Sequence, residues 1–301
     1  MIAQYHNYRL LGLLLLTAVV AAGGVAFFVR GQTDSERFLK TASPYPVLFW
    51  NEKTFTESIR KAKPIDAAPL VNIRAGILPH HLLASDLIAE EFSTVASIEK
   101  PKTIILIGPN HNNRGNAVLS SVRPWGTPFG TVEPDTAVVE SLHSSSVVSL
   151  WGDGFEEEHS IGAIVPFIKY YFPNARLVPI VIRSDIGRVD AERLGKSLAA
   201  LISDESVLLL ASIDFSHYQP RAEAEANDRE TWKAITSFDL SRLSTFGNDH
   251  LDAPWTLVAF LAALKEQEIF RMKLLQNTNS GALTNDDKLL TTSYFTVLFG
   301  K

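Results

Sequence analysis

The chain has 301 residues, of which 46% are hydrophobic and 20% charged, so it can build a packed core and is not typical of a disordered protein. Its 28 basic and 33 acidic side chains give a formal net charge of −5, the wrong sign for a protein that binds the phosphate backbone of nucleic acids. We therefore expect no nucleic-acid partner. The absence of cysteine excludes disulfides, thiolate nucleophiles, iron–sulfur clusters and cysteine-type zinc sites, so any metal would be held by His, Asp or Glu.

An uninterrupted apolar run, Leu10–Val29, lies near the N-terminus between Arg9 and Arg30. Its length matches the hydrocarbon core of a bilayer, which is about 30 Å thick. The run continues past the small residues at which a signal peptide could be cleaved, so we interpret residues 1–31 as a membrane anchor or an uncleaved signal. We favour a short N-terminus inside and an extracytoplasmic domain, and the alternative is a cytoplasmic domain tethered the other way round.

Residues 32–69 are largely polar and contain several prolines. This composition predicts a linker and lead-in segment that takes no part in a regular sheet. We therefore place the folded domain at residues 70–301.

From residue 71 onward, short apolar runs alternate with longer segments of helical periodicity. The predicted strands are Val71–Leu78, Thr103–Ile107, Arg176–Ile182, Val207–Ser212 and Tyr294–Phe299. The predicted helices are Leu83–Ala96, Ser160–Phe172, Val189–Ile202, Glu223–Thr236 and Pro254–Lys265. This alternation predicts a single α/β domain with a largely parallel central sheet and flanking helices, preceded by the N-terminal transmembrane helix.

Six of the eight histidines fall at predicted loop positions, and three of the predicted strands end directly in groups that can bind a metal or move a proton. The first strand runs into His80 and His81, the second into His111, and a third into Asp214 and His217. Because ligands collect at the carboxyl ends of parallel strands, these groups predict one shared site. A single histidine after a strand is more often an ordinary loop residue, so it is their joint occurrence that favours a metal or acid–base site.

The segment Glu156–Ser160 forms a further group at a predicted helix start. Ser160 or the acidic residues would cap this helix, which leaves His159 free to face the same cleft. A run of acidic residues by itself is more typical of a solvated helix face, and Glu158 is its best functional candidate.

Four sequence motifs occur in a fixed order along the predicted domain. They are Pro79-His80, Gly108-Pro109-Asn110-His111, Glu158-His159-Ser160-Ile161 with Pro166-Phe167, and Ser212-Ile213-Asp214-Phe215-Ser216-His217-Tyr218. In these motifs the chain, from about Val71 to the C-terminus, resembles the MEMO family, whose bacterial and archaeal members are called AmmeMemoRadiSam system protein B. The fold of that family is similar to the LigB-type class III extradiol dioxygenases, which implies an α/β core with a site at strand ends.

The resemblance implies that His80 and His111 are metal ligands. The family often has a cysteine four residues before the proline that opens a late helix. Here that proline is Pro254, and His250 stands in the place of the cysteine. We therefore expect His250 as the third ligand, with Asp214 as the alternative.

The remaining candidate residues follow from the same motifs. His81 competes with His80 as a ligand, because this chain has a second histidine where the family usually has a small residue. We expect His159, Asp214 and His217 to be catalytic, with the two imidazoles moving protons at near-neutral pH.

The resemblance implies a divalent metal cofactor, most readily iron and alternatively copper or zinc. Iron would suit a dioxygenase-like oxidation of a dihydroxylated aromatic or similar chelating substrate, whereas zinc would suit hydrolysis. A third interpretation is a non-catalytic module whose cleft binds a peptide or partner segment. The family name further implies radical-SAM and AMMECR-type partners in a modification pathway, besides the membrane contact through the N-terminal helix.

Overall fold

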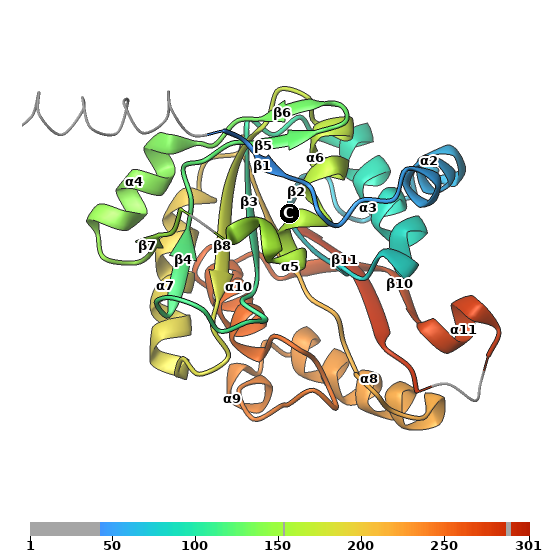
Figure 1. The fold of residues 1–301 in the computed structure, drawn as a ribbon. Coiled ribbons are helices and arrows are strands. Elements are labelled where there is room, and N and C mark those ends of the chain that lie inside the picture. The colour runs from blue at the N-terminus through green and yellow to red at the C-terminus, as the bar shows by residue number, and fades with distance from the viewer. Residues whose placement is uncertain (1–42, 153, 287–289) are drawn as a thin grey trace, which may run out of the picture. The chain divides into compact units, whose positions relative to one another are not determined.

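The side chains of strand β3 (Thr103–Pro109) alternate between two hydrophobic cores that lie on opposite faces of a central sheet. Ile105 and Ile107 belong to one core, and Ile104 and Leu106 to the other, as expected for a strand buried on both faces. The computed structural model describes residues 43–152, 154–286 and 290–301, and Pro44–Lys301 form one unit around this sheet (Figure 1).

The central sheet has eight strands in the order β10-β11-β2-β9-β3-β8-β4-β7. Its middle four strands run parallel: β2 (Ile73–Leu78), β9 (Val207–Ser212), β3 and β8 (Arg176–Ile182). On one side, β11 (Ser293–Gly300) is antiparallel to β2, and β10 (Arg271–Asn279) is antiparallel to β11. On the other side, β4 (Val118–Ser120) is antiparallel to β8 and parallel to β7 (Ser149–Leu150). The prediction of a largely parallel sheet therefore holds for the middle strands, and the whole sheet is mixed.

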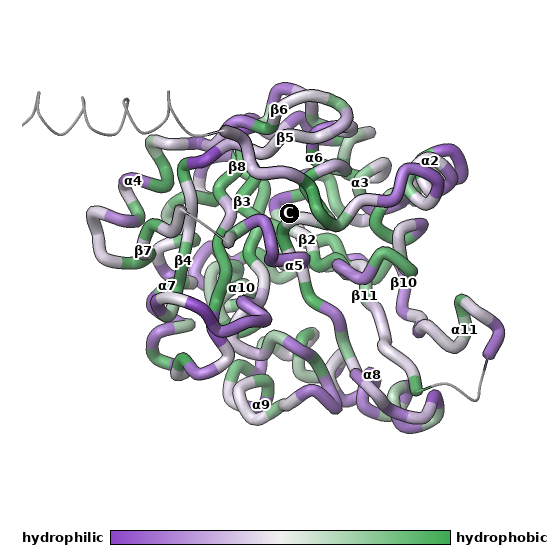
Figure 2. Tube along the Cα trace, viewed as in Figure 1, coloured by the Kyte–Doolittle hydropathy of each residue, from purple (hydrophilic) through white to green (hydrophobic). Residues whose placement is uncertain are grey.

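Helices cover both faces of the sheet, which gives a three-layer α/β/α arrangement (Figure 1). Phe92 of α3 (Ser85–Ile98) and Phe167 of α6 (Val165–Tyr171) belong to the core that contains Ile104. On the other face, α7 (Arg188–Leu201) packs against α10 (Pro254–Glu266). Figure 2 shows hydrophobic residues along the central strands and hydrophilic ones toward the periphery. The other helical elements from Leu82 onward are η1 (Leu82–Ala84), α4 (Thr136–Ser144), η2 (Phe155–Glu157), α5 (His159–Gly162), α8 (Arg221–Thr236), α9 (Leu240–Leu243) and α11 (Ser280–Thr284).

The five predicted strands are confirmed as β2, β3, β8, β9 and β11, with ends that differ by at most two residues. The helix predicted over 160–172 is instead two short helices, α5 and α6. Pro166 stands in the first turn of α6, where a missing N–H is tolerated, so it marks a new helix start. The break matters for function because it leaves His159 at the N-terminal end of a separate short helix.

Part of the expected linker belongs to the folded unit, which corrects that prediction. Tyr45–Pro46 form strand β1, which pairs with β5 (Trp125–Thr127) in a small sheet completed by β6 (Gly130–Val132). Glu52–Lys61 form helix α2, whose Phe55 is buried. Aromatic packing explains the difference, because the Phe55 ring lies 4.6 Å from that of Phe167 between ring centroids.

The apolar run Leu10–Val29 lies outside the described residues. Within residues 43–152, 154–286 and 290–301, no helix is long and apolar enough to cross a membrane.

Candidate metal centre

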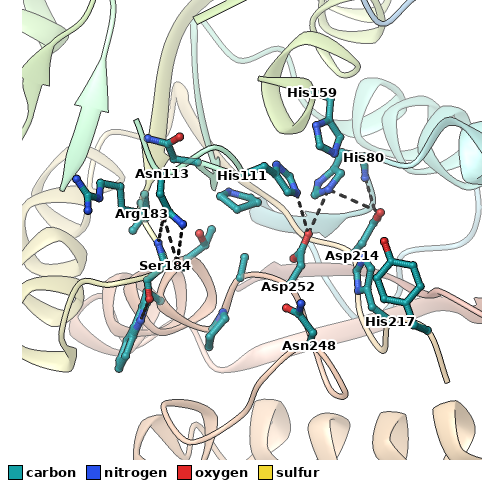
Figure 3. A pocket seen from close by; sticks show the side chains of 18 residues that line it. His80, His111, Asn113, His159, Arg183, Ser184, Asp214, His217, Asn248 and Asp252 are labelled. Atoms are coloured by element: carbon teal, nitrogen blue, oxygen red, sulfur yellow. Dashed lines mark hydrogen bonds and ion pairs between the residues drawn. The ribbon is translucent and has the colours of Figure 1, made fainter. Parts of the chain in front are cut away.

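Four polar groups meet at one edge of the sheet because the four parallel strands lie side by side. His80 follows β2, Asp214 follows β9, His111 follows β3 and Arg183 follows β8. The carboxyl ends of parallel strands lie at the same edge of a sheet, where loops leave room for a ligand. A cavity of about 430 Å³ opens here and is lined by all four residues, as Figure 3 shows.

Three imidazoles gather in this cavity, one from each of three separate chain segments. One ring nitrogen from each of His80, His111 and His159 lies within 4.8 Å of the other two. The rings of His111 and His159 stack with centroids 3.9 Å apart, and the ring of His80 stands nearly perpendicular to both. This group could hold a metal ion, and it joins two expected ligands with a histidine that we expected to be catalytic.

Asp252 faces the same group from the loop before α10. Its Oδ2 lies 3.2 Å from Nε2 of His80 and 3.4 Å from Nε2 of His111. Two donors bound to one ion at about 2.1 Å, with an angle of 90–110° between them, lie about 3.0–3.4 Å apart. Among the described residues, neither buried oxygen of Asp252 has a well-aligned hydrogen bond. Asp252 is therefore close enough to His80 and His111 to be a further candidate ligand beside the three histidines.

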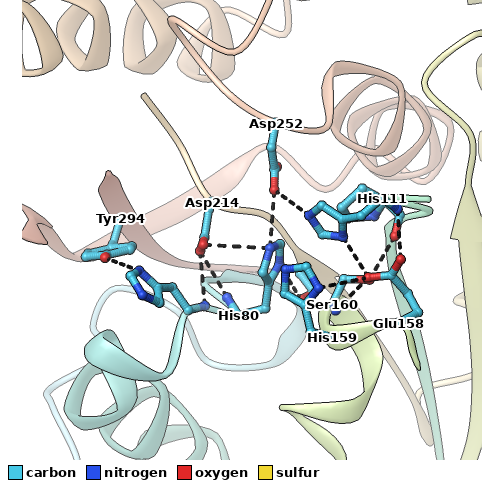
Figure 4. Close-up of polar contacts among 11 residues, drawn as sticks. His80, His111, Glu158, His159, Ser160, Asp214, Asp252 and Tyr294 are labelled. Carbon is cyan, nitrogen blue, oxygen red and sulfur yellow. Dashed lines mark hydrogen bonds and ion pairs between the residues drawn. The ribbon is translucent and has the colours of Figure 1, made fainter. Parts of the chain in front are cut away.

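Outer contacts fix the orientation of the two candidate ligand rings, as Figure 4 shows. The ring of His111 contacts the Oε1 of Glu158 through Nδ1 at 2.7 Å, and its backbone N–H donates to Oε2 at 2.8 Å. Glu158 also accepts from the backbone N–H of Ser160 at 2.9 Å, so it caps α5 as well. On the other ring, Nδ1 of His80 lies 3.2 Å from Oγ of Ser212. Both rings thereby direct Nε2 toward Asp252, the arrangement in which metal-binding imidazoles are usually held.

The charges in the site are strongly coupled. Burial disfavours the charged form of His111, but contacts with Asp252 and Glu158 outweigh it and raise the pKa of His111 to about 10. For His159, burial and the neighbouring His111 and His80 rings lower the pKa to about 4. Burial alone would raise the pKa of Asp252, but His111 and His80 hold it well below its usual range. In the metal-free chain, Asp252 is therefore ionised and His159 neutral at pH 7.

Asp214 and His217 also line the cavity but face it differently. Oδ1 of Asp214 accepts from the backbone N–H of His80 at 3.0 Å, so this carboxylate ties the β9 loop to the β2 loop. Its Oδ2 lies 3.7 Å from Nε2 of His80, farther than Asp252. The Nδ1 of His217 is buried without a hydrogen-bond partner among the described residues.

The structure does not bring His250 into the group, which corrects our expectation of the third ligand. Its Nε2 lies 3.2 Å from Glu230 of α8, and its ring stacks on Phe246 with centroids 4.1 Å apart. His81 also turns away, because its Nδ1 lies 2.7 Å from the hydroxyl of Tyr294. His80 is therefore the histidine of this pair that faces the cavity.

Sequence reasoning missed Asp252 and gave Glu158 little weight. Asp252 stands two residues before Pro254, where an acidic residue is equally typical of an ordinary helix N-terminus. Glu158 was visible as a member of an acidic run, but Glu157 of the same run forms an ion pair with Arg114 instead. Only the fold distinguishes these neighbouring carboxylates.

Comparisons with known proteins identify a matching family model, similar chains and a structure of similar fold. The sequence model described as Memo-like protein matches residues 51–297. The chain is 32% identical over 238 residues to a MEMO1 family protein of Caldivirga maquilingensis, covering 75% of this chain and 82% of the relative. It is 33% identical over 227 residues to another from Methanosarcina barkeri, covering 71% and 82%. An uncharacterized protein of Escherichia coli K12 shares the fold with a TM-score of 0.53 and 14% identity, covering 76% of this chain and all of that one.

Proposed function

Since this chain belongs to the Memo-like protein family, we propose that its cavity holds a divalent metal on His80, His111 and Asp252, with His159 beside them. The observation that carries the proposal is the pair of separations, 3.2 and 3.4 Å, between the Asp252 oxygen and the two imidazole nitrogens. Both values are compatible with neighbouring ligands on one ion, and the ring nitrogens of the three histidines, within 4.8 Å of one another, complete the donor group.

The donor set favours iron among the possible metals. Two histidines and one carboxylate with open positions are typical of non-haem iron(II) sites. We therefore propose a non-haem metal-dependent oxidoreductase as the function. Bound iron(II) would supply redox and Lewis-acid chemistry to a substrate with adjacent oxygen atoms. Copper remains an alternative metal, and zinc on the same ligands would instead suit hydrolysis.

The residues around the ligands have separate tasks in this proposal. His159 is neutral near pH 7 because its pKa is lowered to about 4, so its free lone pair could bind the metal or, as a weak base, accept a proton from an acidic group. His217 lines the same cavity and its Nδ1 has no hydrogen-bond partner within the described part of the chain, so we assign it a second proton-transfer position. Asp214 acts through its contact with the backbone of His80, as a positioning residue.

Metal binding by matched variants tests the proposal. We expect Asp252→Asn to lower the affinity for iron(II) or zinc by at least about 100-fold, because it removes the anionic ligand while keeping the shape of the side chain. His250→Gln, two residues earlier in the same loop, should leave the affinity unchanged. Isothermal titration and elemental analysis of the purified protein measure both variants. Loss of metal from His250→Gln with retention by Asp252→Asn would overturn the ligand assignment.

Turnover separates an enzyme from a binding module. An oxidoreductase should consume a chelating aromatic substrate only when the metal is bound, and both His111→Ala and His217→Ala should abolish this activity. If His217→Ala keeps the affinity for a partner peptide and no turnover is found in the wild type, the non-catalytic interpretation is favoured. We keep radical-SAM and AMMECR-type proteins as proposed partners, to be sought by co-purification.

A further inference from the structure

Tyr218 lines the mouth of the metal-centre cavity, yet its side chain contributes little to the core. It is 71% exposed, which is unusual for a large aromatic residue. Its backbone has φ +55°, in the left-handed region that few residues other than glycine and asparagine adopt readily. An exposed ring on a strained backbone beside a cavity calls for a functional explanation.

The residues on both sides of Tyr218 are tied to different parts of the fold. The backbone N–H of His217 donates to the carbonyl of Asn248 at 2.7 Å. The carbonyl of Gln219 accepts from the backbone N–H of Thr291 at 2.8 Å, next to β11. These two anchors hold the turn in place, so the left-handed conformation persists and the Cα–Cβ bond of Tyr218 keeps its direction beside the cavity.

Asn248 provides a second group on this side of the cavity. Its backbone carbonyl holds His217, and its exposed side-chain amide lines the cavity. Figure 3 shows Asn248 on the opposite side of Asp252 from His159. A ligand between the two sides would therefore meet the histidine group on one side and this amide on the other.

We propose that Tyr218 and Asn248 form a substrate-recognition lip that selects planar, oxygen-bearing molecules, an inference that rests on the proposed metal centre. The Tyr218 ring packs against the flat part of the substrate, and the Asn248 amide hydrogen-bonds a polar substituent. The cavity of about 430 Å³ has room for one small molecule of this kind. The substrate oxygens then face the donor group of His80, His111 and Asp252.

Binding of 4-nitrocatechol to the zinc-loaded full-length protein tests the lip, because zinc keeps the probe from being oxidised. Tyr218→Phe keeps the ring and should bind the probe within about twofold of the wild type. Tyr218→Asn removes the ring but tolerates the left-handed backbone, and it should bind about two- to tenfold more weakly. Asn248→Ala should weaken binding by a similar factor. The melting temperature of Tyr218→Asn should not fall.

The outcomes separate this inference from the metal centre. Metal titration of each variant without the probe should give wild-type affinity. If the wild type binds metal but not the probe, or if Tyr218→Asn binds it as tightly as Tyr218→Phe, the lip is wrong and the metal centre stands. If the wild type binds no metal, the metal centre itself fails and the lip fails with it.

Discussion

The ring of His111 lies between two carboxylates that have different tasks. Glu158 contacts Nδ1 and fixes the ring plane, while Asp252 lies on the Nε2 side, 3.4 Å away. Without a metal, a proton on each nitrogen satisfies both carboxylates, which is why the pKa of His111 is raised to about 10. With a metal on Nε2, the Nδ1 proton stays on the Glu158 side and keeps the ring oriented.

We expect Glu158→Gln to lower metal affinity by about 10- to 100-fold, because it removes the charged acceptor that orients His111. Glu157→Gln is the matched control, since Glu157 pairs with Arg114 at the surface. Isothermal titration with zinc measures both proteins. Equal affinities in the two variants would contradict an orienting role for Glu158.

Glu91 is a buried acidic residue with no assigned function. It lies on α3, and both carboxylate oxygens lack a hydrogen-bond partner among the described residues. Its side chain occupies the space beside Gly76 of β2, where any side chain would clash with the carboxylate. Burial raises the pKa of Glu91 well above its ordinary value, so the folded state prefers the neutral form.

This pKa shift predicts a pH-dependent cost to stability. The favourable contribution of the neutral acid is complete below the unfolded-state pKa of Glu91 and declines as the pH rises through the folded-state pKa. Glu91→Gln removes this titration, so the melting temperature of the variant minus that of the wild type should grow from pH 5 to pH 8. Each kcal/mol corresponds to about 2–4 °C for a chain of this size. Thermal unfolding followed by circular dichroism at both pH values measures the difference, and a constant difference would disprove the shift.

Helices α7 and α10 pack closely because α7 presents a glycine at the contact. A Cβ added at Gly195 would lie 2.6 Å from the carbonyl oxygen of Ala259 and 2.6 Å from the Cβ of Ala262. The carbonyl oxygen of Ala259 belongs to the helix backbone, so it cannot move away by a change of side-chain rotamer. The contact matters for the site because α10 begins at Pro254, two residues after Asp252.

We expect Gly195→Ala to destabilise the protein although alanine is the better helix former. Overpacking costs about 1–3 kcal/mol, and the helix propensity returns at most about 1 kcal/mol. Gly152→Ala is the control, because Gly152 lies in a loop and a Cβ there meets no atom within 4 Å, and its effect should stay within about 0.5 kcal/mol. Urea unfolding compares the two variants, and a gain in stability for Gly195→Ala would contradict the close contact.

At the scale of the whole molecule, the chain combines the α/β unit with the apolar run Leu10–Val29. We propose that this run anchors the protein in a membrane and that the domain with its cavity lies on the extracytoplasmic side. An apolar run of this length satisfies its backbone hydrogen bonds in lipid only as a helix.

Deletion of residues 1–42 should release the protein from the membrane fraction without changing its metal affinity, because the deleted segment contains none of the candidate ligands. Fractionation of cells and zinc titration of the truncated protein measure the two effects. Full-length protein that stays soluble without detergent and keeps its N-terminus would contradict the anchor.

The sequence by itself determined the α/β class and the positions of His80, His111 and Asp214 at strand ends. These features depend on local patterns, because a continuous buried strand is visible as an apolar run and the residue after it lies at the sheet edge. The edge strand β10 was not predicted, because it lacks such a local pattern. It mixes Arg271, Lys273 and Gln276 with apolar residues and is only partly buried, so it lacks a clear hydrophobic pattern.

Only the tertiary structure decided which carboxylates and histidines face the cavity. His250 and Asp252 are two residues apart in one loop, and the path of that loop into α10 turns the histidine toward Glu230 and the carboxylate toward His80. Neighbouring loop residues have no fixed periodicity that would indicate their direction, in contrast to residues in strands and helices. The candidate metal centre thus depends on contacts between segments far apart in the chain, which local sequence patterns do not encode.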